Sequence, residues 1–172
     1  MPDTLEQMKT RRSIRKYKSD AVPAELVKAV AEAGTYAATG MGMQSPIIVA
    51  VTDKDTRDQL SKMNAAVMGV SSDPFYGAPV VLVVLADKTR GTYLYDGSLV
   101  MGNMMLAAHT LGLGSCWIHR AKEEFESPEG KALLKSWGIE GDYEGIGHCI
   151  LGYPDGAAPA AKPRKENYIY YV

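Results

Sequence analysis

The chain has 172 residues, 46% of them hydrophobic, with 19 basic and 20 acidic side chains and a sequence pI of about 6.3. This length suits one domain over residues 1–172 with its own core, and the pI argues against the extended basic face of nucleic-acid binders. No apolar run is long enough to span a bilayer, and the first residues lack the basic and apolar regions of a signal peptide. We therefore expect a cytoplasmic protein with no nucleic-acid or membrane partner.

The N-terminal residues predict a short helix that leads into a compact basic cluster. Thr4 and Gln7 match a capping box at the start of this helix. Residues 11–15 follow and read Arg-Arg-Ser-Ile-Arg. Arginine offers a fork of donors that matches phosphate oxygens, and serine adds a neutral donor. On a near-neutral chain this cluster favours a small phosphorylated ligand over a polyanion, and the alternative is a run of solvated surface charges.

The next part of the chain predicts alternating helices and strands. Residues 23–37 form an amphipathic pattern that begins at a proline, and residues 53–68 predict a helix capped by its first residue. Residues 46–52 and 79–86 are continuous apolar runs typical of buried strands. The turn-rich loop 69–77 either connects these elements or covers a site.

The C-terminal half predicts two more strands and a tail. Residues 91–111 form a helix with almost no polar face, which places it centrally or in a subunit interface. Strands are expected at 115–118 and 144–153, with a helix at 127–138 between them. An apolar tail, residues 168–172, follows, and the predicted elements leave no room for it as a further layer of the same domain. We expect this tail to add a strand to a neighbouring sheet.

Four strands separated by helices predict an α/β or α+β sandwich whose sheet is covered on both faces. Cys116 and Cys149 lie inside apolar runs, so we expect buried, reduced thiols and no disulfide. A second basic pair, Lys162 and Arg164, matches the N-terminal cluster in kind. If the two ends of the chain meet, both basic groups surround one phosphate.

Other signatures of common chemistry are absent. The sequence has no dinucleotide fingerprint, P-loop, zinc-protease or nucleophile-elbow motif. His109, His119 and His148 are far apart and lack metal-ligand spacing, so each is expected to be structural and we assign no metal. We also assign no catalytic residue.

Four segments, in order, resemble the FMN-dependent nitroreductase family. They are residues 11–17, Gln44-Ser45-Pro46, residues 106–118 and Lys162-Pro163-Arg164, so the likeness covers nearly the whole chain. The resemblance implies a compact α+β homodimer with a central, mostly antiparallel sheet and helices on both faces. It also implies that FMN sits between the subunits and that the extension 154–172 is exchanged with the dimer partner.

The resemblance further implies a set of cofactor contacts. The N-terminal arginines, Ser13 and the C-terminal basic pair are expected at the phosphate and ribityl chain, Arg15 and Asn64 at the pyrimidine end, and residues 114–115 near flavin N5. Residues 39–44 are expected from the partner chain or the rim of the cleft. The full set of FMN contacts is Arg11, Arg12, Ser13, Arg15, Thr39, Gly40, Gln44, Asn64, Gly114, Ser115, Lys162 and Arg164.

The segment 38–46 departs from the family pattern, because Gly42 replaces the usual asparagine and the tryptophan is missing. This change predicts a more open wall beside the cofactor. The implied activity is hydride transfer from NAD(P)H through FMN to a nitroaromatic, a quinone or a similar small acceptor, with ping-pong kinetics. Open alternatives are a flavin-storage protein, a ferredoxin-fed reductase, a dehalogenating or flavin-fragmenting relative, and a sensor of phosphorylated ligands.

Overall fold

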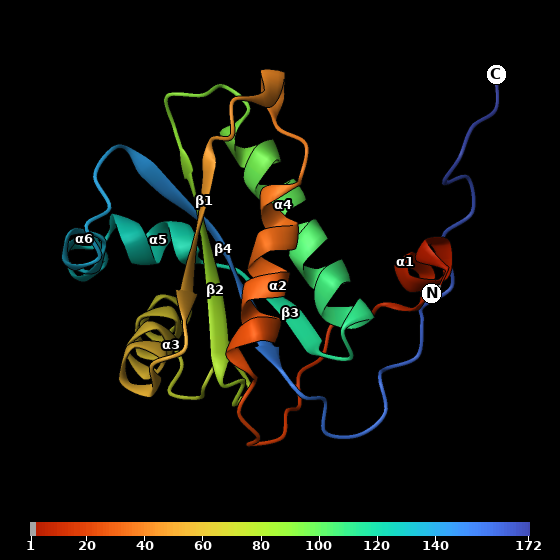
Figure 1. Cartoon of the computed structure of the whole chain (residues 1–172), viewed down its shortest axis with the longest axis horizontal. Helices are drawn as coiled ribbons and strands as arrows, with labels where there is room; N and C mark the ends of the chain where they lie inside the picture. The colour runs from red at the N-terminus through yellow and green to blue at the C-terminus, as the bar shows by residue number, and fades with distance from the viewer. Residues whose placement is uncertain (1–2) are drawn as a thin grey trace.

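A computed structural model describes residues 3–172 (Figure 1). These residues form four strands, six α-helices and one short 3-10 helix. In chain order the elements are α1 (Thr4–Thr10), α2 (Ala24–Thr35), η1 (Gly40–Gly42), β1 (Pro46–Val51), α3 (Lys54–Met68), β2 (Val80–Asp87), α4 (Tyr93–Thr110), β3 (Gly114–Ile118), α5 (Ala121–Glu126), α6 (Pro128–Ser136) and β4 (Tyr143–Gly152).

The four strands form one sheet in the order β1-β2-β4-β3, and every neighbouring pair is antiparallel. β2 and β4 are the central strands and are buried along nearly their whole length. β1 and β3 are therefore the two edges of the sheet, and they lie on opposite sides of the molecule. This order decides which segments can share a site within one protomer.

Helices cover both faces of the sheet, as Figure 1 shows: α2 and α4 lie on one face, and α3, α5 and α6 lie on the other. The side chains of β2 alternate between the two layers, since Val80, Leu82 and Val84 belong to the core under α2 and α4. Val81, Val83 and Leu85 belong to the core under α3 and α5. A two-residue side-chain period on a strand buried on both faces accounts for the continuous apolar run of β2.

The expected α+β sandwich is confirmed, and most of the expected elements are present. One expected cap is wrong, because Asp3 rather than Thr4 caps the start of α1: its carboxylate accepts a hydrogen bond from the Leu5 N–H at 3.0 Å. Helix α5 was not expected, since its six residues are too short for a helical pattern to stand out. Residues 156–172 form neither helix nor strand in the single protomer, and the tail from Tyr168 to Val172 is exposed.

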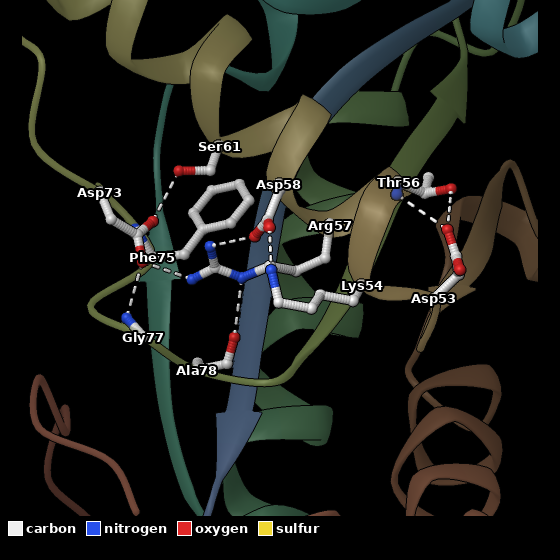
Figure 2. A network of polar contacts seen from close by, with 10 residues as sticks. All are labelled: Asp53, Lys54, Thr56, Arg57, Asp58, Ser61, Asp73, Phe75, Gly77 and Ala78. Carbon is white, nitrogen blue, oxygen red and sulfur yellow. Dashed lines mark hydrogen bonds and ion pairs between the residues drawn. The ribbon is translucent and has the colours of Figure 1, made fainter. Parts of the chain in front are cut away.

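Arg57 anchors the loop between α3 and β2, as Figure 2 shows. Its guanidinium donates to the Ala78 carbonyl at 2.9 Å, to Asp58 at 3.1 Å and to Asp73 at 2.5 Å. It also lies over the Phe75 ring, 5.4 Å from the centroid. Arg57 is only 8% exposed, so its charge is almost fully removed from water but fully partnered.

Asp73, which accepts a hydrogen bond from Arg57, also organises the turn that follows it. Asp73 accepts hydrogen bonds from the Ser61 hydroxyl and from the backbone N–H groups of Phe75 and Gly77. Burial raises the pKa of Asp73, but the hydrogen bonds from Arg57, Ser61 and the backbone outweigh it and leave the pKa below its usual value. The loop packs through Phe75 into the core under α3, which favours a connecting role over that of a cover.

None of the helices formed by residues 3–172 combines the length and apolar character needed to cross a membrane. Both cysteines are buried and unpaired. Burial is the main cause that raises the pKa of Cys149 to about 12, so its thiol stays protonated near neutral pH.

Candidate functional site

The basic segment after α1 runs beside the edge strand β3. The Ile14 N–H donates to the Ser115 carbonyl at 2.9 Å, and Ser13 forms an isolated parallel bridge with Ser115. Gly114 permits this close approach, because a Cβ there would lie 3.0 Å from the Ile14 side chain. The structure therefore brings Ser13 together with Gly114 and Ser115 at the start of β3, which are far from Ser13 in the sequence.

A cavity of about 700 Å³ lies between this segment and the C-terminal tail. Figure 1 shows the reason: the tail passes close to α1 after leaving the sheet. The lining residues come from both ends of the chain and include six cations. They are Met8, Lys9, Arg11, Arg12, Ser13, Arg15, Pro159, Ala160, Ala161, Lys162 and Arg164.

The cations of this cavity, which we call the arginine cavity, differ in how far they are satisfied. Arg12 is turned back on the end of α1, where it donates to the carbonyls of Lys9 and Arg11 at 2.7 Å each. Arg164 donates to the Lys162 carbonyl at 2.8 Å. Arg11 is different, because its Nη1 is buried and has no hydrogen-bond partner within residues 3–172.

A buried guanidinium nitrogen without a partner costs free energy, on the order of 1 to 3 kcal/mol. Arg11 is one of the residues that line the cavity, and no acidic side chain is among them. Arginine, lysine and serine donors together match the oxygens of a phosphate. The arrangement therefore fits the phosphate end of a small ligand such as FMN.

The loop 39–45 is held by a buried carboxylate at the start of α4. Asp96 is 2% exposed and accepts the Gly40 N–H at 2.9 Å, the Ser45 hydroxyl at 2.7 Å and the Thr92 hydroxyl at 3.0 Å. Burial raises the pKa of Asp96, but these three bonds outweigh it, so the pKa lies below its usual value. Gly40 has no room for a side chain, because a Cβ would approach Thr92 Oγ1 to 2.2 Å.

The protomer does not bring this loop to the arginine cavity. Thr39 and Gln44 instead line a second cavity of about 620 Å³, which lies along α2 and the edge strand β1. Its floor is apolar and its rim carries Lys28 and Glu32. Since β1 and β3 are opposite edges of the sheet, the two cavities lie on different sides of one protomer. The role expected of Thr39, Gly40 and Gln44 stays a prediction that requires a second subunit.

Asn64 lies away from both cavities. Its side chain is fully buried: the amide nitrogen donates to the His119 carbonyl and to Glu124, each at 2.8 Å, and the amide oxygen accepts from Arg120. Glu124 in turn contacts the buried ring of His148 at 2.5 Å. Both amide hydrogens of Asn64 are thus used inside the protomer, so we leave Asn64 out of the proposed ligand contacts.

Several cavity residues escaped the sequence analysis. Met8 and Lys9 precede the arginine cluster by only a few residues, and the last turn of an amphipathic helix was the available signal. The sequence of Pro159–Ala161 gave no indication of a binding role, because these lining residues have small side chains without polar groups. Within residues 3–172, no three His, Cys, Asp or Glu side chains are grouped so as to hold a metal ion.

Comparison with known proteins places this geometry in context. The model of the nitroreductase family matches residues 8–153. A curated relative from Methanothermobacter thermautotrophicus, provisionally named NADH dehydrogenase/NAD(P)H nitroreductase, is 32% identical over 119 residues. That match covers 67% of this chain and 60% of the relative. The chain thus spans less than two thirds of the length of that relative.

Two further matches extend over nearly all of the chain. The NADPH-flavin oxidoreductase of Vibrio harveyi is 29% identical and matches 98% of this chain and 72% of its own length. The crystal structure of a nitroreductase with bound FMN from Bacteroides fragilis superposes with a TM-score of 0.90, at 29% identity and over 100% of both chains.

Proposed function

Because this chain belongs to the nitroreductase family, we propose that it is a flavin-dependent oxidoreductase that binds FMN and oxidises NAD(P)H. The arginine cavity is the observation that carries this proposal: cations from both ends of the chain line it, and Arg11 among them has a buried Nη1 with no hydrogen-bond partner among residues 3–172. The bound FMN of the Bacteroides fragilis structure and the name of the Vibrio harveyi relative support the same ligand and the same reaction class.

We place the phosphate of FMN in the arginine cavity. Arg11 donates its unpaired Nη1, and Ser13, Lys162 and Arg164 complete the set of donors. Arg12 contributes charge while its Nη1 remains on the helix end. The ring is then expected to extend along β3 from Gly114 and Ser115, with Arg15 as the cation beside its pyrimidine end. When bound, FMN supplies the hydride-accepting ring, so the protein contributes binding, orientation and charge.

We propose that the active form is a homodimer in which the C-terminal extension 154–172 wraps around the partner subunit. Exposed apolar side chains support this, since Ile169 is 67% and Tyr171 92% exposed in the single protomer. The edge strand β1 has an unpaired side that can accept an added strand. A second subunit also brings its own residues 39–44 toward the arginine cavity, which one protomer cannot do.

The acceptor is proposed to be a nitroaromatic, a quinone or a similar small, flat molecule. NAD(P)H and the acceptor are expected to use the same cleft in turn, which gives ping-pong kinetics. Gly42, in the left-handed conformation with φ of 67°, has open space where a side chain would stand. Met41 beside it is 97% exposed, so this part of the wall has few fixed contacts to select one acceptor.

The test is an absorbance spectrum of the purified protein before and after anaerobic addition of NADH and then NADPH. We expect flavin bands that bleach with at least one nicotinamide and return when menadione or nitrofurazone is added. Intersecting rather than parallel lines in the double-reciprocal plots of steady-state rates contradict the ping-pong order. A molecular mass of one chain in light scattering contradicts the homodimer.

The same spectrum separates the alternatives. A yellow protein that neither nicotinamide bleaches indicates flavin storage or another electron donor, such as a ferredoxin. A colourless protein that binds no added FMN contradicts the proposal and favours a sensor of another phosphorylated ligand.

A further inference from the structure

One histidine lies where α1 meets α4, beside the start of residues 11–15, which we call the arginine segment. His109 is in the last turn of α4, and its Nε2 is 3.0 Å from the hydroxyl of Thr10, the last residue of α1. Arg11 follows Thr10 in the chain and carries the buried, unpaired nitrogen. The contact between His109 and Thr10 therefore holds the end of α1 at the point where the arginine segment begins.

The hydrogen positions at this contact follow from counting donors. The Thr10 hydroxyl has one hydrogen, and it donates this hydrogen to the Glu6 carbonyl at 2.7 Å. Thr10 Oγ1 must then accept from the imidazole, so Nε2 of His109 carries a hydrogen. This hydrogen is present in both the neutral and the cationic ring, because Nδ1 is the atom that gains the additional proton. The contact therefore persists when His109 titrates.

The charged groups that act on the ring are Arg11 and Arg12, both from the segment after α1. On the helix that carries His109, residues 104–110 include no Asp, Glu, Lys or Arg. Helix α2 also offers no charge here, because Ala29 and Ala33 line its side of the hollow beside this end of α4. Burial lowers the pKa of His109, and the two guanidinium charges lower it further. His109 is thus neutral near pH 7 as long as the charges of the cavity are not compensated.

We propose that His109 is a positioning residue of the arginine cavity, which holds the arginine segment through Thr10 and couples anion binding to the uptake of a proton at Nδ1. The inference rests on the anion site of the proposed function. An anion bound between Arg11 and the C-terminal cations offsets the positive potential of the arginines, which disfavours the cationic form of the His109 ring. Anion binding then favours protonation, and by linkage protonation favours anion binding.

The direction of the pH dependence follows from this coupling. Below the pKa of the free protein His109 is already cationic, and anion affinity is at its highest. Above the pKa of the complex the ring is neutral in both states, and affinity is at its lowest. Affinity therefore falls as pH rises between the two values. The phosphate of FMN acts in the opposite direction, since its own second ionisation near pH 6 adds negative charge as pH rises.

The positioning role is tested by the affinity of FMN for the apoprotein, measured from the quenching of flavin fluorescence. His109→Ala removes the contact and should weaken FMN binding by roughly 2- to 10-fold. His109→Gln can still donate from its amide to Thr10 and should restore most of the affinity. Thr10→Val should weaken binding as His109→Ala does, and the double variant should lose little more than either single variant.

The proton coupling is tested with radiolabelled sulfate in equilibrium dialysis, because sulfate keeps two negative charges throughout the range and needs no flavin. Between pH 5 and pH 8 the affinity of the wild-type apoprotein should fall by roughly 3- to 10-fold, because the anion raises the pKa of His109. His109→Gln should show a nearly flat profile. His119→Gln, which removes an exposed histidine, is the matched control and should follow the wild type.

The possible results separate this inference from the proposed function. Equal FMN affinity in His109→Ala and the wild type overturns the positioning role, and a wild-type sulfate profile in His109→Gln overturns the coupling. A protein that binds sulfate with the expected profile but binds no FMN keeps the coupling and contradicts the proposed function. If His109→Ala does not fold, the comparison of Thr10→Val with Thr10→Ser decides the positioning role.

Discussion

Two arginines, Arg57 and Arg11, differ in how far their guanidinium groups are buried and partnered. Every part of the Arg57 guanidinium has a partner: two carboxylates, the Ala78 carbonyl and the face of an aromatic ring (Figure 2). Arg11 Nη1 is buried and has no partner in the part of the chain that the structure describes. Folding removes the Arg57 charge almost fully from water and compensates it within the chain, whereas Arg11 is only partly buried and just one of its nitrogens is enclosed.

This difference in hydrogen-bond partners distinguishes an arginine that stabilises the fold from one that binds a ligand. A buried arginine with a complete set of partners is part of the fold, since removing it leaves acceptors such as Asp73 without a donor. A buried arginine nitrogen without a partner is a cost to the fold, and a ligand of opposite charge removes that cost. Arg57 and Arg11 should therefore respond in opposite ways to substitution.

The largest effect is expected for Arg57→Met, which should lower the free energy of unfolding by about 3 kcal/mol because a half-buried carboxylate and a carbonyl lose their donor. Urea denaturation followed by circular dichroism measures this loss. Lys54→Met is the control on the same helix, since the Lys54 side chain is 85% exposed, and its midpoint should be unchanged. Equal losses in the two variants contradict the structural role of Arg57.

The next effect is expected for Arg11→Ala, which should weaken FMN binding by about 2 kcal/mol because a charge-assisted contact is lost. Its free energy of unfolding without flavin should be unchanged or slightly higher, since the unpaired nitrogen is gone. Flavin retention through desalting and a urea titration of the apoprotein measure the two quantities. An Arg11→Ala protein that stays yellow through desalting contradicts the assignment.

A third prediction concerns acid, because the pKa of Asp73 is below its usual value in the folded protein. A carboxylate of this kind stabilises the fold above its unfolded pKa of about 4, and the contribution is lost as pH falls through the folded value. Asp73→Asn should be less stable by about 1 kcal/mol at neutral pH and should lose less on acidification below pH 4. Thermal midpoints from pH 2 to pH 7 test this, and parallel curves for the two proteins contradict it.

The smallest effect is expected for Arg164→Ala, because this side chain is exposed and its contribution is screened by salt. FMN affinity should fall by about threefold at low ionic strength and by less at 0.5 M salt. Fluorescence titrations at two salt concentrations measure both values. A loss as large as that of Arg11→Ala, with no dependence on salt, shows that the tail is ordered around the ligand more tightly than in the protomer.

The fold was largely predictable from the sequence because its strands are unambiguous. The apolar run of β2 is typical of a strand buried on both faces, and the apolar pattern of α4 indicates a place in the centre or in a subunit interface. Antiparallel pairing and the strand order did not follow from these patterns, because the order depends on which connections cross the sheet. The helix α5 was missed because two turns carry too few apolar positions.

The site was predictable in part for a related reason. The Arg-Arg-Ser-x-Arg cluster and the Lys162–Arg164 pair carry a chemical signal, and the structure brings them to one cavity. Asn64 carries an equally polar side chain, yet packing between α3, α5 and β4 uses it inside the protomer. The contact between Thr10 and His109 joins residues 99 positions apart, so only the folded chain can show it.

The C-terminal residues from 154 onward can be lost without removing any part of the hydrophobic cores. Both hydrophobic cores are built from residues that precede residue 154, whereas Lys162 and Arg164 come after it. A stop codon at position 154 thus leaves every strand, helix and core contact in place and deletes one wall of the arginine cavity. The product is expected to fold and to escape quality control while remaining colourless, so loss of function at this locus can arise without loss of protein.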